Sequence, residues 1–173
     1  MNKAVLLFLI FLLGMGIMRV QAQENSQSAD LVLYQQAIKA IKEKKFVFKA
    51  SLHDNGRRYQ QVDPSRNYII LDNDLVTLSC YDIRGWSYEG KITKYKLRTD
   101  KKGNLHLDIT VKAGYKSISK WDFCIEKGSN HCVVVRNPVR AEARFVFTGE
   151  LFPYNTSGLY TPIIYNNEDR MKK

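Results

Sequence analysis

The chain has 173 residues, three cysteines and a formal net charge of +10. This length suits one domain that buries a sizeable core, so neither a structural metal nor a set of disulfides is needed for folding. No internal repeat or low-complexity tract divides the sequence.

Residues 1–22 have the pattern of a secretory signal peptide. Lys3 precedes an apolar run over residues 4–18, and Val20 and Ala22 occupy the −3 and −1 positions of a small-residue cleavage site. An uncleaved membrane anchor is the alternative, but the run is shorter than the roughly 20 residues of a spanning helix. We therefore expect cleavage near Ala22 and a soluble, exported protein, periplasmic or extracellular, kept away from ATP, nicotinamide cofactors and chromosomal DNA.

The remaining 151 residues carry 25 basic and 17 acidic side chains, a net charge of +8. A basic exported protein suits an acidic partner, such as lipopolysaccharide or an acidic glycan. The alternative is that the charge serves solubility and attraction to a negatively charged cell envelope.

Residues 23–29 form a polar leader, which we expect to be loose, and a helix is predicted over residues 29–44. Ser28 is a suitable N-cap residue. The apolar face recurs at spacings of three and four: Leu31, Tyr34, Ile38 and Ile41. We interpret this segment as a packing helix. Membrane binding by a basic amphipathic helix is the alternative, which Glu43 disfavours.

From Phe46 onward the apolar period changes from about 3.6 to 2, which is typical of strands. Strands are predicted over residues 46–53, 68–71, 75–81, 91–98, 105–112, 117–126, 132–136 and 144–151. Short alternating strands with turn residues between them predict an antiparallel sandwich or half-open barrel. The expected fold is thus α+β, mainly β, with one domain over residues 30–165 and a disordered tail over residues 166–173.

Two hairpins can be aligned from the alternation. In the first, the predicted pairs are Leu97–Leu105, Tyr95–Leu107, Lys94–Asp108 and Lys96–His106. In the second, which turns about Gly128, the predicted pairs are Phe123–Val133, Trp121–Val135 and Cys124–Cys132. Each alignment keeps one face apolar, as a half-buried sheet requires.

The pair Cys124–Cys132 leads to a prediction of a disulfide. Opposed residues of antiparallel strands have Cα atoms about 4.5–5.5 Å apart, within reach of a disulfide. Export to an oxidising compartment favours the bond. The alternative is two buried thiols that pack as small apolar groups. Cys80 lies in a predicted strand and is expected to be buried.

The order of these elements resembles the domain-of-unknown-function 4251 family, small exported proteins of Gram-negative gut anaerobes. The resemblance runs from about residue 31 to residue 151, and the matching segments are KFVFKA (45–50), NYII (67–70), GKITKY (90–95), LDITV (107–111), WDFCI (121–125) and FVFTGEL (145–151). Two departures are Cys80, where the family tends to have proline, and a longer connection over residues 137–143. The resemblance implies an export signal and a mainly β domain, and it supplies no activity and no site residues.

Enzymatic and metal sites have little support in the sequence. His53, His106 and His131 show no metal-ligand spacing, and no Gly-x-Ser-x-Gly motif occurs. We therefore assign no catalytic, cofactor-binding or metal-binding residue. Nucleic-acid binding is also disfavoured, because Tyr95 lies on the opposite strand face from the basic stripe of Lys94, Lys96 and Arg98.

The leading hypothesis is a non-enzymatic envelope protein that binds a partner protein or a small acidic or saccharide ligand, with only peripheral association to a membrane. The candidate surfaces are the basic stripe (Lys94, Lys96, Arg98) and an aromatic loop (Tyr81, Trp86, Tyr88). An alternative for Trp86 is that it plugs the end of the barrel. Two other functions stay open: a small secreted hydrolase, and a structural envelope protein without a small ligand.

Overall fold

The computed structural model describes residues 28–54, 56, 58–84, 86–113, 117–138 and 145–156. The predicted signal peptide, the leader up to residue 27 and the tail over residues 166–173 lie outside these ranges. A helix over residues 28–42 comes first. The elements that follow are β1 (Lys45–Asp54), β2 (Tyr59–Gln61), β3 (Asn67–Asp72), β4 (Leu75–Cys80), α2 (Tyr81–Arg84), β5 (Trp86–Thr99), β6 (Leu105–Ala113), β7 (Ser117–Ile125), β8 (His131–Pro138), β9 (Phe145–Pro153) and η1 (Tyr154–Thr156).

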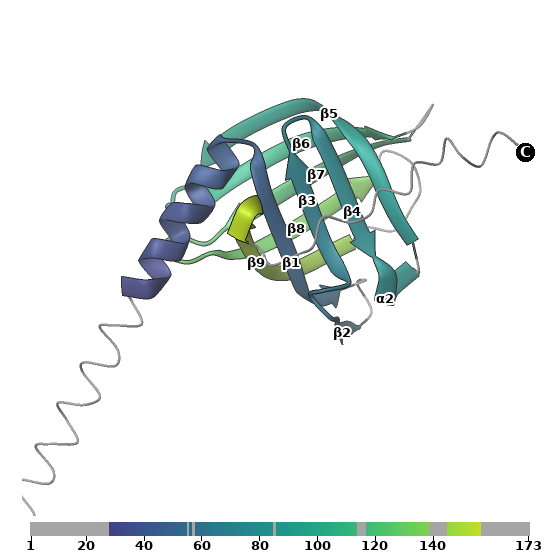
Figure 1. Ribbon diagram of the computed structural model, residues 1–173, viewed down its shortest axis with the longest axis horizontal. Coiled ribbons are helices and arrows are strands. Elements are labelled where there is room, and N and C mark those ends of the chain that lie inside the picture. Colours follow the sequence, from purple (N-terminus) through teal and green to yellow (C-terminus); the bar gives the residue numbers. More distant parts are fainter. Residues whose placement is uncertain are drawn as a thin grey trace, which may run out of the picture.

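The strands form one antiparallel sheet that closes on itself. Its order is β2-β1-β3-β4-β5-β6-β7-β8-β9, and β1 also pairs with β9, so every strand except β2 belongs to a closed barrel (Figure 1). The predicted mainly β fold with an N-terminal helix is confirmed. Of the two predicted architectures, the half-open barrel is close to the closed barrel observed, and the sandwich is wrong, because two packed sheets need free edges that the β1–β9 pairing removes.

The closing pair of strands contains an irregularity that changes which residues face inward. The register of β1 against β9 shifts between Ala50 and Leu52. One extra residue in a strand reverses the alternation beyond it. His53 is consequently inside the barrel and only 3% exposed, whereas strict alternation from Phe46 placed it on the solvent side.

The N-terminal helix closes one end of the barrel. Ala37, Ala40 and Ile41 belong to the same buried core as Phe46, Phe123 and the other inward-facing barrel residues. Leu31, which the sequence pattern assigned to the packing face, is 53% exposed, because the first half of the helix projects beyond the barrel (Figure 1). Of the predicted apolar face, Ile41 is buried and Tyr34 packs against the core, so the prediction is wrong at Leu31. Among the described residues, no helix has the length and apolar character needed to cross a membrane.

The first predicted hairpin has the right faces but the wrong register. Leu97 pairs with Leu107, Tyr95 with Ile109 and Lys96 with Asp108, two residues from the predicted partners. The turn is centred on Lys102, whereas the predicted pairs centre on Lys101: the Asp100 amide donates to the Asn104 carbonyl oxygen at 3.0 Å, and the Gly103 amide donates to the Asp100 carbonyl oxygen at 3.1 Å. A shift of two residues preserves the inward and outward sets of side chains.

The second predicted hairpin is wrong by one residue. Cys124 pairs with Val133, and Cys132 pairs with Ile125. Because strand side chains alternate, this shift puts the two cysteines on opposite faces of the barrel wall. Cys132 and Cys80 are buried in the core, Cys124 is half-buried, and all three are free thiols. The predicted Cys124–Cys132 disulfide is therefore wrong, while the predicted burial of Cys80 is confirmed.

Candidate functional site

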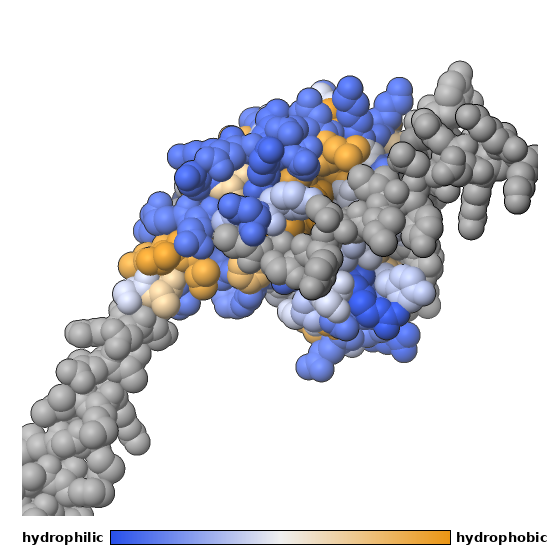
Figure 2. All heavy atoms as spheres, in the orientation of Figure 1, coloured by the Kyte–Doolittle hydropathy of each residue, from blue (hydrophilic) through white to orange (hydrophobic). Residues whose placement is uncertain are grey.

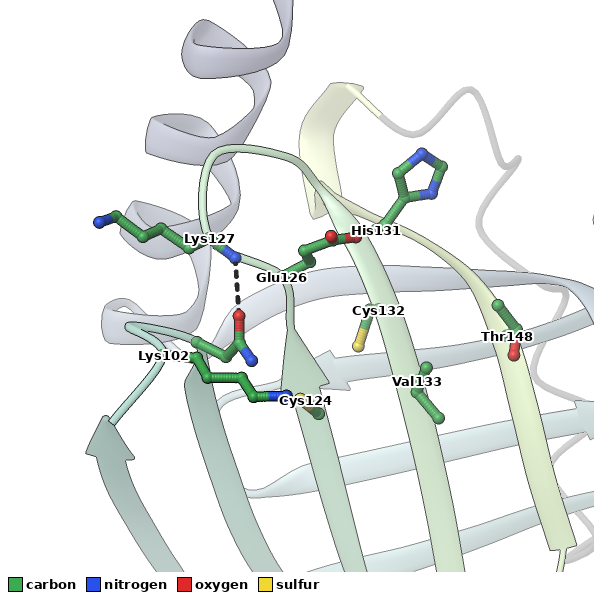
Figure 3. Close-up of a pocket in the computed structure, with 9 residues that line it drawn as sticks. Lys102, Cys124, Glu126, Lys127, His131, Cys132, Val133 and Thr148 are labelled. Carbon is green, nitrogen blue, oxygen red and sulfur yellow. Dashed lines mark hydrogen bonds between the residues drawn. The ribbon is translucent and has the colours of Figure 1, made fainter. Parts of the chain in front are cut away.

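A hollow of about 680 Å³ opens on the barrel wall at the end that the helix closes. It lies between the β5–β6 turn and the β7–β8 hairpin, with a wall from β8 and β9 (Figure 3). Its lining residues are Lys102, Asn104, Cys124, Glu126, Lys127, His131, Cys132, Val133 and Thr148. Three segments that are separate in the sequence thus meet at one concave surface.

Local hydrogen bonds fix the two turns that border the hollow. The Asp100 carboxylate accepts bonds from the backbone amides of Lys102 at 2.9 Å and Asn104 at 2.9 Å. Gly103 takes a φ of +89° inside this turn, a conformation that favours glycine. The Asn104 side-chain oxygen then accepts a bond from the backbone amide of Lys127 at 3.1 Å. This single side chain therefore joins the β5–β6 turn to the β7–β8 hairpin.

Charged groups of both signs surround the hollow. Lys102 extends across it toward Cys124, whereas Lys127 and His131 point outward at its rim (Figure 3). Glu126 contributes the one carboxylate among the lining residues. Among the described residues, neither Lys102 nor Lys127 has a carboxylate within 4.0 Å, so both ammonium groups can meet an anion.

A network of polar side chains continues from Cys124 along the outer wall. The Cys124 Sγ lies 3.6 Å from Nε2 of His106. On the other side of the ring, Nδ1 lies 3.2 Å from Oδ1 of Asp122, and Nε2 also lies 3.3 Å from Oδ2 of Asp100. Arg98 completes the network, with contacts of 3.0 Å to Asp108 and 3.4 Å to Asp122.

The network shifts several pKa values. Burial raises the pKa of Asp100, but hydrogen bonds from Asn104, His106 and Lys102 outweigh it and lower that pKa to about 2. Burial raises the pKa of the Cys124 thiol, and the carboxylates of Asp122 and Asp100 raise it further. Cys124 is accordingly a neutral thiol at neutral pH.

The Cys124–His106–Asp122 arrangement resembles the nucleophile, base and orienting acid of a cysteine hydrolase. Two observations oppose that interpretation. A nucleophilic cysteine needs a lowered pKa, and here it is raised. The ring nitrogen that would take the thiol proton also faces Asp100, and a nitrogen that donates to a carboxylate is not free to accept. The network is better suited to holding three strands in place.

No metal site is evident in the part of the chain that the structure describes, where no three His, Cys, Asp or Glu side chains are placed to hold an ion together.

Comparison with solved structures shows a likeness of fold. A DUF4251 family protein from Bacteroides eggerthii superposes with a TM-score of 0.66 at 24% sequence identity, over 76% of this chain and 94% of that chain. The chain has the DUF4251 fold. The expected resemblance is thus confirmed at the level of structure. No family model matches the sequence, and no curated protein is similar to it at a significant level.

The DUF4251 fold distributes the predicted site residues over separate surfaces. Lys94, Lys96 and Arg98 are exposed on one outer face of β5, but Arg98 is engaged by Asp108 and Asp122. Tyr81 is 57% exposed and stacks against Arg66, whose guanidinium lies 4.4 Å from the ring centroid. The side chains of Trp86 and Tyr88 lie outside the described residues.

The predicted aromatic loop and the predicted basic stripe do not form one surface. Tyr81 directly follows Cys80, which pairs with Trp86. Lys94 is eight residues further along β5 than Trp86, which corresponds to about 26 Å at about 3.3 Å per residue.

The hollow was not predicted from the sequence, although both of the turns that border it were. Nothing in the local pattern indicates that the turns at Lys102 and Lys127 lie at the same end of the barrel.

Proposed function

We propose that the protein is an exported, non-enzymatic binding module whose ligand site is the hollow between the β5–β6 turn and the β7–β8 hairpin. The observation that carries this proposal is the concave surface of about 680 Å³ lined by polar groups from three separate segments of the chain. Ligand sites usually measure about 300–1,000 Å³ and have a few polar groups that fix the ligand's orientation.

The chemistry of the lining supports a small acidic ligand, with a sugar acid as the best match. Lys102 supplies a cationic group inside the hollow for a carboxylate, and Lys127 adds a second positive charge at the rim (Figure 3). Glu126, His131 and Thr148 supply hydrogen-bonding groups that suit hydroxyls. Val133, 38% exposed, offers a small apolar surface beside them. This combination fits one acidic saccharide unit better than a purely apolar molecule.

Export is supported by the signal-peptide pattern of residues 1–22. It places the protein where acidic saccharides are encountered and where ATP and nicotinamide cofactors are not. A structural envelope role without a small ligand is the competing proposal for the same location.

The test is native mass spectrometry of the protein isolated from its own cell envelope, followed by titration with glucuronic and galacturonic acid. We expect a defined extra mass or saturable binding, lost in the double variant Lys102→Gln/Lys127→Gln. The matched control Lys39→Gln/Lys42→Gln removes the same charge from the helix and should bind as the natural protein does. A bare mass together with no response to either acid would refute the proposal.

A small hydrolase is the second candidate, and it rests on the Cys124–His106–Asp122 geometry. It would require turnover on an ester, glycoside or peptide substrate that disappears in Cys124→Ser. The raised thiol pKa is the reason that we rank it second.

A further inference from the structure

Five exposed lysines lie together on the outer face of β5, β6 and β7, away from the hollow. The strand pairing places Lys91 opposite Lys112, and it places Thr110 between Lys94 and Lys120. Lys96 lies two residues beyond Lys94 on the same face of β5. We call this set the lysine face: Lys91, Lys94, Lys96, Lys112 and Lys120, all exposed. Hydrophilic side chains cover the region over β5 (Figure 2).

A β-bulge assembles this face. The register of β5 against β6 shifts between Ile92 and Lys94, and the extra residue, Thr93, bonds through its hydroxyl to the carbonyl oxygen of Thr110 at 3.2 Å. Ile92 and Tyr95 can both point inward only because of this extra residue. The bulge therefore puts Lys91 on the same outer surface as Lys94 and Lys96, whereas strict alternation would separate them.

The lysine face keeps its positive charge. Among the described residues, none of its five ammonium groups has a carboxylate within 4.0 Å. Two aspartates share this wall, Asp108 opposite Lys96 on β6 and Asp122 beside it on β7, and both are held by Arg98. Glu89 is a further acid on the outer face of β5, two residues before Lys91. With Arg98 counted, these six basic residues outnumber the three acids by three, and Asp74 at the neighbouring turn is paired with Lys44.

The charges form a two-dimensional array and not a line. Neighbouring strands are about 4.8 Å apart, and alternate residues along a strand are about 6.6 Å apart. The lysines thus cover about 10 Å across the strands and about 16 Å along β5. Ile118 pairs with Lys112 and is 44% exposed, which adds an apolar side chain at the margin of the basic surface.

We propose that the lysine face docks the protein on an anionic lipid bilayer. A planar array of phosphates meets a two-dimensional set of cations more completely than a single linear chain does. Exposed basic residues beside a partly exposed apolar one are the pattern of peripheral attachment, in which each lysine near the surface strengthens binding about fivefold. This goes beyond the ligand proposed for the hollow, and either proposal can fail without the other.

The test is co-sedimentation of the purified protein with vesicles of phosphatidylcholine that contain about 30% phosphatidylglycerol, at low ionic strength, where such attraction is least screened. The natural protein should sediment with these vesicles and should be released at high salt. Lys94→Gln/Lys96→Gln/Lys120→Gln should bind about 100-fold more weakly, since three lysines are removed. Circular dichroism verifies that this variant is folded.

A matched control removes three lysines elsewhere: Lys39→Gln/Lys42→Gln/Lys45→Gln. It should retain nearly all binding. Equal loss in the two triple variants would overturn the proposal, because net charge alone would then explain attachment. Equal binding to pure phosphatidylcholine would overturn it too. If soluble polygalacturonate displaces the protein from the vesicles at stoichiometric amounts, the lysine face serves an acidic polysaccharide and not a membrane.

Discussion

The hydroxyl of Tyr95 on β5 donates a hydrogen bond to the carbonyl oxygen of Ile41 at the end of the N-terminal helix, at 2.5 Å. Lys44, with a φ of 56°, ends the helix there, and its ammonium lies 5.1 Å from the centre of the Tyr95 ring. One tyrosine thus connects the barrel wall to the helix that closes it.

This connection predicts a dependence of stability on alkaline pH. Burial raises the pKa of Tyr95, while a tyrosine in the unfolded chain titrates near pH 10. Below about pH 10 both states are protonated. Above it the unfolded state loses its proton first, so the free energy of unfolding should fall by up to about 1.4 kcal/mol per pH unit.

Comparison of the natural protein with Tyr95→Phe by urea unfolding between neutral pH and pH 11 would measure this contribution. The variant should be less stable at neutral pH by about 0.5–1.5 kcal/mol, the usual worth of one hydrogen bond. It should also lose less stability at high pH. Parallel curves for the two proteins would contradict the role of Tyr95.

Gly149 is expected to stabilise the closure of the barrel, because it lets β9 approach β1 closely. It pairs with Ala50 beside the bulge in β1, and a Cβ at this position would overlap the backbone carbonyl oxygen of Lys49. Gly149→Ala should destabilise the protein by roughly 1–3 kcal/mol, the common cost of overpacking. Thermal unfolding checks this, with Glu150→Ala as the control on the next, exposed residue, which should change stability by less than about 0.5 kcal/mol.

The three cysteines should differ in reactivity. Cys124 is half-buried at the hollow, whereas Cys80 and Cys132 are buried, and burial also raises the pKa of Cys132. Maleimide labelling of the folded protein should modify Cys124 alone, slowly at neutral pH and faster above pH 9, because the thiolate is the reactive form. Intact mass after unfolding without a reductant should show three labels. A maximum of one label would mean that a disulfide is present.

The Asp100 side chain should stabilise the β5–β6 turn only while its carboxyl group is ionised. Its pKa is lowered to about 2, so its contribution to stability is complete above the unfolded value near 4 and is lost as the pH falls toward 2. Asp100→Asn should flatten this part of the acid-unfolding profile. An unchanged profile would show that the hydrogen bonds to Lys102 and Asn104 contribute little.

The sequence predicted the helix and the main strands well, because apolar periodicity is a local property. It did not predict their alignment. The two-residue error in the pairing of Leu97 left every side chain on its proper face. The one-residue error in the pairing of Cys132 put Cys124 and Cys132 on the same face of the barrel wall and so predicted a false disulfide. The bulges near Ser51 and Thr93 have no local sequence signal, and they decide that His53 is inside and that Lys91 joins the lysine face.

Closure between β1 and β9 also determines how the chain must fold. Phe46 and Pro153 are paired although they stand at opposite ends of the barrel sequence. Pairings of such long range are slow to form, since the entropy of closing a large loop is lost before any contact is gained. The core cannot be closed off from solvent until β9 pairs with β1. If the chain is released from its N-terminus onward, the sheet therefore stays open, with its core exposed to solvent, until β9 has been released.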